Sequence, residues 1–128
     1  KANELNNGGY WVQNNAVDGL LEFQDEQVDI MVLNSFLEHE LHPISLLKNA
    51  RAKLKKAGVI IIKVPNFNCW NRLVFGYKWC GFRHPDHVNY FTPKTLKASI
   101  AMAGFENYKM GFNDAYPWSD SMYMIAYK

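Results

Sequence analysis

The chain has 128 residues, of which 48% are hydrophobic and 20% charged, and its formal net charge is +2. This composition is typical of a single globular domain and excludes a disordered chain. The small net charge gives no reason to expect a nucleic-acid partner, and no apolar run reaches the roughly 18 residues that a membrane span requires. Two cysteines are too few for a disulfide framework, so a reducing cytoplasm is the expected compartment.

The charges are distributed unevenly along the chain. Residues 18–40 contain seven acids and no Lys or Arg, whereas residues 41–85 contain nine bases and no acid. Two interpretations are open. The pattern fits a solvated helix face followed by a basic loop, and it also fits a cleft with one acidic and one basic wall, which would suit an anionic substrate.

Two buried strands with a helix between them are predicted in the first half of the chain. Tyr10–Val12 is a plausible short strand, and residues 14–27 are mostly loop. Val28–Leu33 and Val59–Val64 are nearly continuous apolar runs, which are typical of strands buried on both faces of a sheet. A helical spacing begins at Pro43 and is ended by Gly58, so the segment forms a βαβ unit with parallel strands.

The second half predicts a helix followed by an antiparallel hairpin. Thr92 is a suitable N-cap and Pro93 a suitable first-turn residue, while Gly104 is the expected left-handed residue after the helix. Phe105–Phe112 and Met122–Tyr127 are predicted to be two strands, close enough in sequence to pair with each other. The predicted fold class is therefore α/β.

Polar side chains follow both buried strands directly, at Asn34–His39 and at Pro65–Phe67. Ligands of open parallel sheets bind beyond the carboxyl ends of the strands. An acid beside a histidine at such a place, here Glu38 and His39, could supply proton transfer. Alternatively, the two residues begin a loop and cap the next helix.

Several segments resemble class I S-adenosylmethionine-dependent methyltransferases. Val28–His39 is similar to the family's fourth strand and following loop, which ends in Leu-Glu-His. Leu54–Asn66 is similar to the next turn and fifth strand, and His87–Leu96 with Ala103–Phe105 is similar to a late helix of one small-molecule subgroup. The resemblance covers residues 10–112, and the order of the motifs is more specific than any one of them.

The resemblance implies a Rossmann-like fold with helices on both faces of the sheet. It also implies transfer of the sulfonium methyl group of S-adenosylmethionine to a small-molecule acceptor. In such a fold Asn34 and Ser35 would lie along the methionine part of the cofactor. Val17 and Asp18 would lie near its adenine.

The resemblance also implies candidate catalytic residues. Glu38 and His39 would face the reacting centre or order the loop, and His87 would be a base, a substrate partner or a structural residue that ties the 67–91 segment to the sheet. Some relatives that methylate quinone precursors hold a divalent metal with a similar Glu-His pair and a further carboxylate. Ser35 takes the place of that carboxylate here, so no metal site is expected.

The sequence departs from the family in its cofactor motifs. No Gly-x-Gly occurs anywhere in the chain, and too few residues precede Tyr10 to build the first two strands. We therefore expect a partial, N-terminally truncated methyltransferase domain, and a catalytically incompetent fragment is the alternative. The edge of the Val28–Leu33 strand would then be bare, and we expect residues 1–17 or a second copy of the chain in a homo-oligomer to cover it.

Residues 67–91 form an aromatic-rich insertion at the place where the family commonly builds a substrate cap. Aromatic and basic residues together suit a ring-bearing or anionic substrate. The candidate substrate-binding residues are Asn66, Trp70, Trp79 and Tyr90. Two alternatives are aromatic side chains that simply fill a small core and an aromatic-basic module that binds anionic ligands without catalysis.

A zinc site in the same insertion is a weaker possibility. It would use four potential ligands, namely Cys69, Cys80, His84 and His87. The tight Cys-x-x-Cys spacing of structural zinc sites is absent, so the sequence does not favour zinc.

Overall fold

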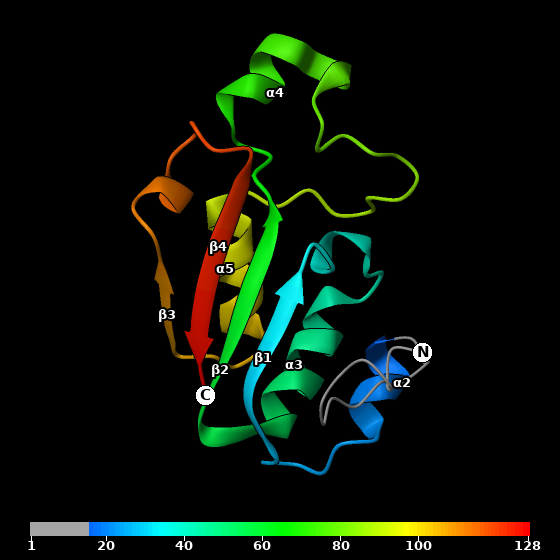
Figure 1. The fold of residues 1–128 in the computed structure, drawn as a ribbon, viewed down its shortest axis with the longest axis vertical. Helices are drawn as coiled ribbons and strands as arrows, with labels where there is room; N and C mark the ends of the chain where they lie inside the picture. The colour runs from blue at the N-terminus through cyan, green and yellow to red at the C-terminus, as the bar shows by residue number, and fades with distance from the viewer. Residues whose placement is uncertain (1–15) are drawn as a thin grey trace, which may run out of the picture.

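A computed structural model describes residues 16–128, so the strand expected at Tyr10–Val12 lies outside the described residues. The described chain forms one four-stranded mixed sheet with the order β1-β2-β4-β3 (Figure 1). β1 (Val28–Asn34) runs parallel to β2 (Leu54–Pro65), as the βαβ interpretation predicts. β3 (Asn107–Met110) and β4 (Ser121–Tyr127) form the predicted antiparallel hairpin, and β4 also pairs with β2. The α/β fold class is confirmed.

Two helices cover one face of this sheet. α3 (Pro43–Lys53) and α5 (Pro93–Met102) lie on the same side of the sheet (Figure 1). They contribute buried leucine, isoleucine and alanine side chains to a single core with the inner side chains of the sheet. The Thr92 hydroxyl accepts a hydrogen bond from the Thr95 backbone N–H, so the predicted N-cap is confirmed. Gly104 has φ 92°, the left-handed conformation expected after the helix.

Two element boundaries differ from the sequence prediction. α3 ends at Lys53, and β2 begins at Leu54 instead of after Gly58, because the buried Leu54 is paired with Val28 in the parallel ladder. α2 (Ala16–Leu21) is a helix where a loop was expected. The apolar pattern that would predict this short helix is weak, since Val17 and Leu20 are the two of its described side chains that pack against the core.

The prediction that β1 is buried on both faces is wrong. Leu33 is buried under the helices, but Ile30 and Val32 are 61% and 59% exposed on the opposite face. An apolar run shows that a strand tolerates burial, and it does not show that both faces are covered.

β1 is also the terminal strand of the sheet, because its one partner among the described strands is β2. Ala16 and Val17 belong to α2, which packs on α3, so they do not pair with this edge. Coverage of the edge by residues 1–15, which lie outside the described residues, or by a second copy stays a prediction.

The acidic segment forms three ion pairs, two with lysines of the basic segment and one with the C-terminal Lys128. Lys53 contacts Asp25 at 2.7 Å, Lys55 contacts Asp29 at 2.8 Å, and Lys128 contacts Glu26 at 3.4 Å. These acids are exposed to solvent, which screens the charges, so each pair adds little to stability. For these residues the solvated-surface interpretation of the charge pattern holds. Across the described residues, no helix has the length and apolar character needed to cross a membrane.

Candidate functional site

A polar pocket lies beyond the carboxyl ends of β1 and β2. The 3-10 turn Leu37–His39 follows β1, and the end of β2 pairs with the start of β4 through Pro65 and Ser121. A pocket of about 320 Å³ opens between these ends and the chain around residues 80–87. Its polar lining includes Ser35, Glu38, His39, Arg83, His87 and Asp120.

The structure brings together all three predicted catalytic side chains. Glu38, His39 and His87 each present a potential ligand atom, and these atoms all lie within 4.8 Å of one another. The two imidazole rings meet edge to face with their centroids 4.6 Å apart. His87 reaches this place from the aromatic insertion because its neighbours Val88 and Asn89 donate backbone hydrogen bonds to the Glu38 carbonyl, both at 2.9 Å.

The hydrogen bonds of the two histidines determine which ring nitrogen is available. His39 Nδ1 lies 2.7 Å from the Asp86 carbonyl oxygen, and His87 Nδ1 lies 2.8 Å from the Gly81 carbonyl oxygen. A carbonyl oxygen can only accept, so Nδ1 carries the proton in each neutral ring. The Nε2 lone pair of each histidine is therefore available as a base or a ligand.

Glu38 is a buried acid with an unsatisfied oxygen. The residue is 1% exposed, and Oε2 has no hydrogen-bond partner among residues 16–128. An unpaired carboxylate removed from water is strongly disfavoured, so such groups normally have a partner. A proton or a cation at this place would satisfy the oxygen.

Asp120 is a pocket residue that the sequence analysis missed, because it was placed in a loop between two strands. Its Oδ1 accepts a hydrogen bond from Trp79 Nε1 at 2.8 Å, and its Oδ2 accepts one from Asn71 Nδ2 at 2.9 Å. Burial opposes ionisation, but hydrogen bonds from Asn71, Trp79 and Cys69 outweigh it and lower the pKa of Asp120. Its place in the pocket depends on the pairing of β4 with β2, which brings the start of β4 to the end of β2 and which no local sequence pattern reveals.

Three of the predicted substrate-binding residues are occupied in other contacts. Asn66 is fully buried, donates to the Tyr116 carbonyl at 3.2 Å and accepts from the Asn68 N–H at 3.0 Å. Trp79 is buried and bonded to Asp120. Trp70, at the start of α4 (Trp70–Phe75), is 56% exposed and meets Trp118 edge to face. None of the three lines the polar pocket.

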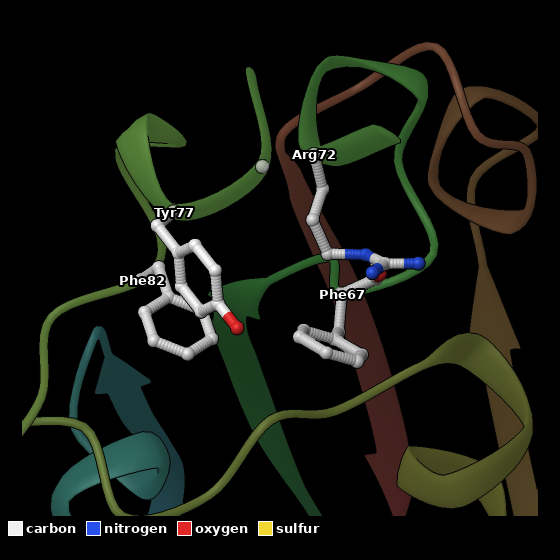
Figure 2. A pocket seen from close by; sticks show the side chains of 5 residues that line it. Phe67, Arg72, Tyr77 and Phe82 are labelled. Atoms are coloured by element: carbon white, nitrogen blue, oxygen red, sulfur yellow. The ribbon is translucent and has the colours of Figure 1, made fainter. Parts of the chain in front are cut away.

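Tyr90, the fourth of these residues, contacts the rings of Phe67 and Phe82, two residues that line a second pocket, but does not line it itself. Figure 2 shows the side chains of Phe67, Arg72, Tyr77 and Phe82 around this hollow of about 300 Å³. The Arg72 guanidinium carbon lies 4.2 Å from the Phe67 ring centroid, and Nε donates to the Phe67 carbonyl. Tyr90 stacks on Phe82 with centroids 5.1 Å apart. Guanidinium and aromatic faces together suit a planar or anionic ligand.

The residues proposed for the cofactor divide into two groups. Asn34 is the last residue of β1, and Ser35, which follows it with φ 51°, lines the polar pocket. A non-glycine residue in the left-handed region is uncommon and is frequent at functional sites. Val17 packs against the core from α2, and neither it nor Asp18 lines the pocket.

The four-ligand zinc arrangement is not formed. Cys69 is buried, and burial raises the pKa of its thiol. In the described part of the chain, the His, Cys, Asp and Glu side chains gathered closely enough to hold a metal are Glu38, His39 and His87.

The fold and the pocket define an α/β protein with a polar site at the carboxyl ends of its parallel strands. A family of sequences described as "Methyltransferase domain" matches residues 3–110, and the chain belongs to this family. No curated protein matches the sequence significantly.

Solved structures share the fold. An S-adenosylmethionine-dependent methyltransferase from Archaeoglobus fulgidus is 21% identical with a TM-score of 0.74, over 91% of this chain and 66% of that one. A possible histamine N-methyltransferase from Thermotoga maritima is 18% identical with a TM-score of 0.75, over 94% and 65%. The trans-methyltransferase CalH in complex with SAH is 18% identical with a TM-score of 0.70, over 97% and 37%.

At these identities the likeness shows the fold. The first two structures are described as S-adenosylmethionine-dependent methyltransferases, and the third was solved with SAH bound. The chain spans just under two thirds of the length of the first two structures.

Proposed function

We propose that the polar pocket is the acceptor side of a site for S-adenosylmethionine-dependent methyl transfer to a small molecule. The single observation that supports this most strongly is the Glu38–His39–His87 cluster, which lies beyond the carboxyl ends of two parallel strands in a chain of the methyltransferase family. Ligands of open parallel sheets bind at this end.

The cluster is suited to removing a proton from an acceptor. An Nε2 lone pair of His39 or His87 takes the proton of the acceptor group while the freed electron pair attacks the sulfonium methyl carbon. The new bond joins the acceptor atom to this carbon, the carbon–sulfur bond breaks, and sulfur keeps that electron pair to leave a neutral thioether. Such a displacement needs its reactants held in line, and a well-placed base adds to its rate.

The chain supplies part of a cofactor site in this proposal. Asn34 and Ser35 lie along the methionine part, and Val17 and Asp18 serve the adenine side, as the family resemblance implies. The sequence contains no Gly-x-Gly, the motif that normally cradles this cofactor. A chain that has the fold but cannot hold the cofactor is therefore the alternative.

The proposed acceptor is a ring-bearing or anionic small molecule. This class is supported by the aromatic pocket, where Arg72 and Phe67 present a cation and a ring face beside Tyr77 and Phe82 (Figure 2). The proposed substrate contact is Tyr90, whose buried hydroxyl has no partner in the described part of the chain. Trp79 supports the pocket through its edge-to-face contact with Phe67, whose ring centroid lies 6.2 Å away. Asn66 and Trp70 stay predicted substrate contacts. The free cysteines fit the reducing cytoplasm expected from the sequence.

Calorimetry with S-adenosylhomocysteine tests the proposal. We expect saturable heat for the wild-type chain and loss of that heat in Ser35→Trp, which fills the pocket beside β1. Asn113→Ala, at an exposed site outside the pocket, is the matched control and should bind as the wild type does. No heat at millimolar S-adenosylhomocysteine would favour the alternative, a chain that has the fold but cannot hold the cofactor. A salt-dependent affinity for oligonucleotides would favour the anion-binding module instead.

A further inference from the structure

We propose that an exposed aromatic patch at one end of the molecule binds an anionic lipid surface. This end patch consists of six side chains from two segments, namely Trp70, Leu73, Val74, Tyr77, Phe112 and Trp118. Each of the six residues is between 45% and 87% exposed. Figure 1 shows α4, which carries three of them, at the end of the long axis and beyond the sheet.

The apolar face of α4 points to solvent. Trp70, Leu73 and Val74 have the i, i+3, i+4 spacing that places side chains on one face of a helix. Such a face normally packs into a core, but no residue of α4 is buried. Tyr77 follows in the 3-10 turn Gly76–Lys78 and is also exposed. Within the described part of the chain, this helix therefore presents an apolar face that nothing covers.

A second segment extends the same surface. The rings of Trp118 and Trp70 meet edge to face with their centroids 6.2 Å apart, and the Trp70 backbone N–H donates to the Pro117 carbonyl at 2.7 Å. The ring centroids of Phe112 and Trp118 are 5.9 Å apart. The two segments thus form one contiguous patch, and contiguous exposed apolar surface marks an interaction site.

The charges beside the patch favour an anionic partner. Residues 66–85 contain three bases and no acid, and of these bases Lys78 and Arg83 are exposed. The Asp114 carboxylate, near the second segment, accepts a hydrogen bond from the Tyr123 backbone N–H at 2.8 Å. Basic side chains close to a bilayer are attracted to the negative surface potential of anionic lipids.

The composition of the patch is that of a membrane interface. Tryptophan and tyrosine have an apolar ring body and a polar tip, and they are enriched where hydrocarbon meets water. A short helix with an apolar face and basic residues beside it lies in the plane of such an interface and does not cross it. α4 is the outermost element at this end of the described chain, so a flat surface can approach it (Figure 1).

Lipid binding stands apart from the proposed function, but one consequence rests on that function. Tyr77 belongs to the end patch and also lines the aromatic pocket. Its ring meets Phe82 edge to face with centroids 5.5 Å apart (Figure 2). An amphipathic acceptor dissolved in the lipid therefore has a short route from the bilayer into this pocket.

Vesicle flotation of the full chain, without cofactor or acceptor, tests the surface. We expect binding to vesicles of phosphatidylcholine and phosphatidylserine at about 2:1, and at least about tenfold weaker binding to phosphatidylcholine alone. The double variant Leu73→Gln/Val74→Thr should bind the mixed vesicles at least about tenfold more weakly. Leu41→Gln/Val32→Thr is the matched control, because it makes the same changes at residues outside the patch that are 73% and 59% exposed. This control should bind as the wild type does.

A pair of lysine variants tests the electrostatic part. Lys78→Gln should weaken binding to the mixed vesicles about fivefold, because one lysine is removed beside the lipid surface. Lys56→Gln removes an exposed lysine from the start of β2, away from the patch, and should bind as the wild type does.

Tryptophan fluorescence of the wild-type chain gives a readout that needs no variant. The mixed vesicles should shift the emission to shorter wavelength because Trp70 and Trp118 leave water. The proposal is overturned if the mixed vesicles neither bind the chain nor shift its emission, or if phosphatidylcholine alone binds as tightly. It is also overturned if the Leu41/Val32 control loses as much binding as the patch variant. Self-association in sedimentation that the patch variant abolishes, in a chain that does not float, would assign the patch to a second copy instead.

Discussion

Trp79 donates its indole N–H to the Asp120 carboxylate across 2.8 Å. This bond joins the aromatic insertion to the residue that directly precedes β4. The indole is buried, and the carboxylate forms part of the polar pocket wall. This hydrogen bond thus helps to hold the insertion over the sheet, and it orients an acidic side chain in the wall of the proposed site.

Replacing this donor should destabilise the protein. Trp79→Phe keeps an aromatic ring but removes the hydrogen bond to an ionised group, which should lower the free energy of unfolding by about 1.5–3 kcal/mol. Trp118→Phe is the control, since its indole donates to Asn113 at 3.2 Å on an exposed surface and should cost about 1 kcal/mol or less. Urea unfolding of both variants gives the comparison, and equal losses would contradict the structural role of Trp79.

Asp120 should make stability depend on pH. Its pKa in the folded chain is lowered, so its stabilising contribution is complete above the unfolded value of about 3.9 and is lost as pH falls through the folded value. The difference in unfolding free energy between the wild type and Asp120→Asn should therefore be constant near neutral pH and shrink below about pH 4. Asp25, whose pKa is lowered by its hydrogen bond and charge interaction with Lys53, is present in both proteins and cancels. A difference in unfolding free energy that is unchanged down to pH 3 would show that these hydrogen bonds do not stabilise the ionised form of Asp120.

Gly81 should not tolerate a side chain. A Cβ at this position would overlap the Trp79 ring, and the Gly81 carbonyl is the acceptor that orients His87. Gly81→Ala should cost about 1–3 kcal/mol in urea unfolding and shift the His87 ring resonances in NMR spectra. Gly111→Ala is a milder control, because its Cβ would meet the end of one side chain, the Asp114 carboxylate, and not a buried ring. Unchanged His87 resonances in Gly81→Ala would contradict the positioning role.

Neighbouring residues of β1 should respond oppositely to truncation. Leu33→Ala removes a side chain from the core and should cost about 2–5 kcal/mol, whereas Val32→Ala on the exposed face should cost about 0.5 kcal/mol or less. Similar losses at both positions would show that another segment covers the second face in solution.

The sequence predicts local elements well where a single physical rule determines them. Thr92, Pro93 and Gly104 mark the ends of α5 because capping chemistry needs these residue types, and the 3.6-residue spacing after Pro43 identifies α3. The same rules place the end of α3 too late. The residues around Leu54 fit the helical spacing as well as a strand, and only the pairing of Leu54 with Val28 shows that they belong to β2.

The candidate site was predicted in part. Glu38 and His39 follow from their place after β1, and His87 follows from the family resemblance, but their mutual approach depends on backbone bonds from Val88 and Asn89 to Glu38 that no local pattern reveals. Asp120 and Arg72 were missed as site residues because their roles depend on tertiary contacts with Trp79 and Phe67.

The central claim is that the pocket beside Asn34 and Ser35 is one side of a methyltransferase site. An NMR titration of the isotopically labelled chain with S-adenosylhomocysteine tests it residue by residue. We predict that the largest saturable shifts fall on the amides of Asn34, Ser35 and Glu38. Shifts confined to the Tyr77 and Phe82 pocket, or none at millimolar ligand, would contradict the claim.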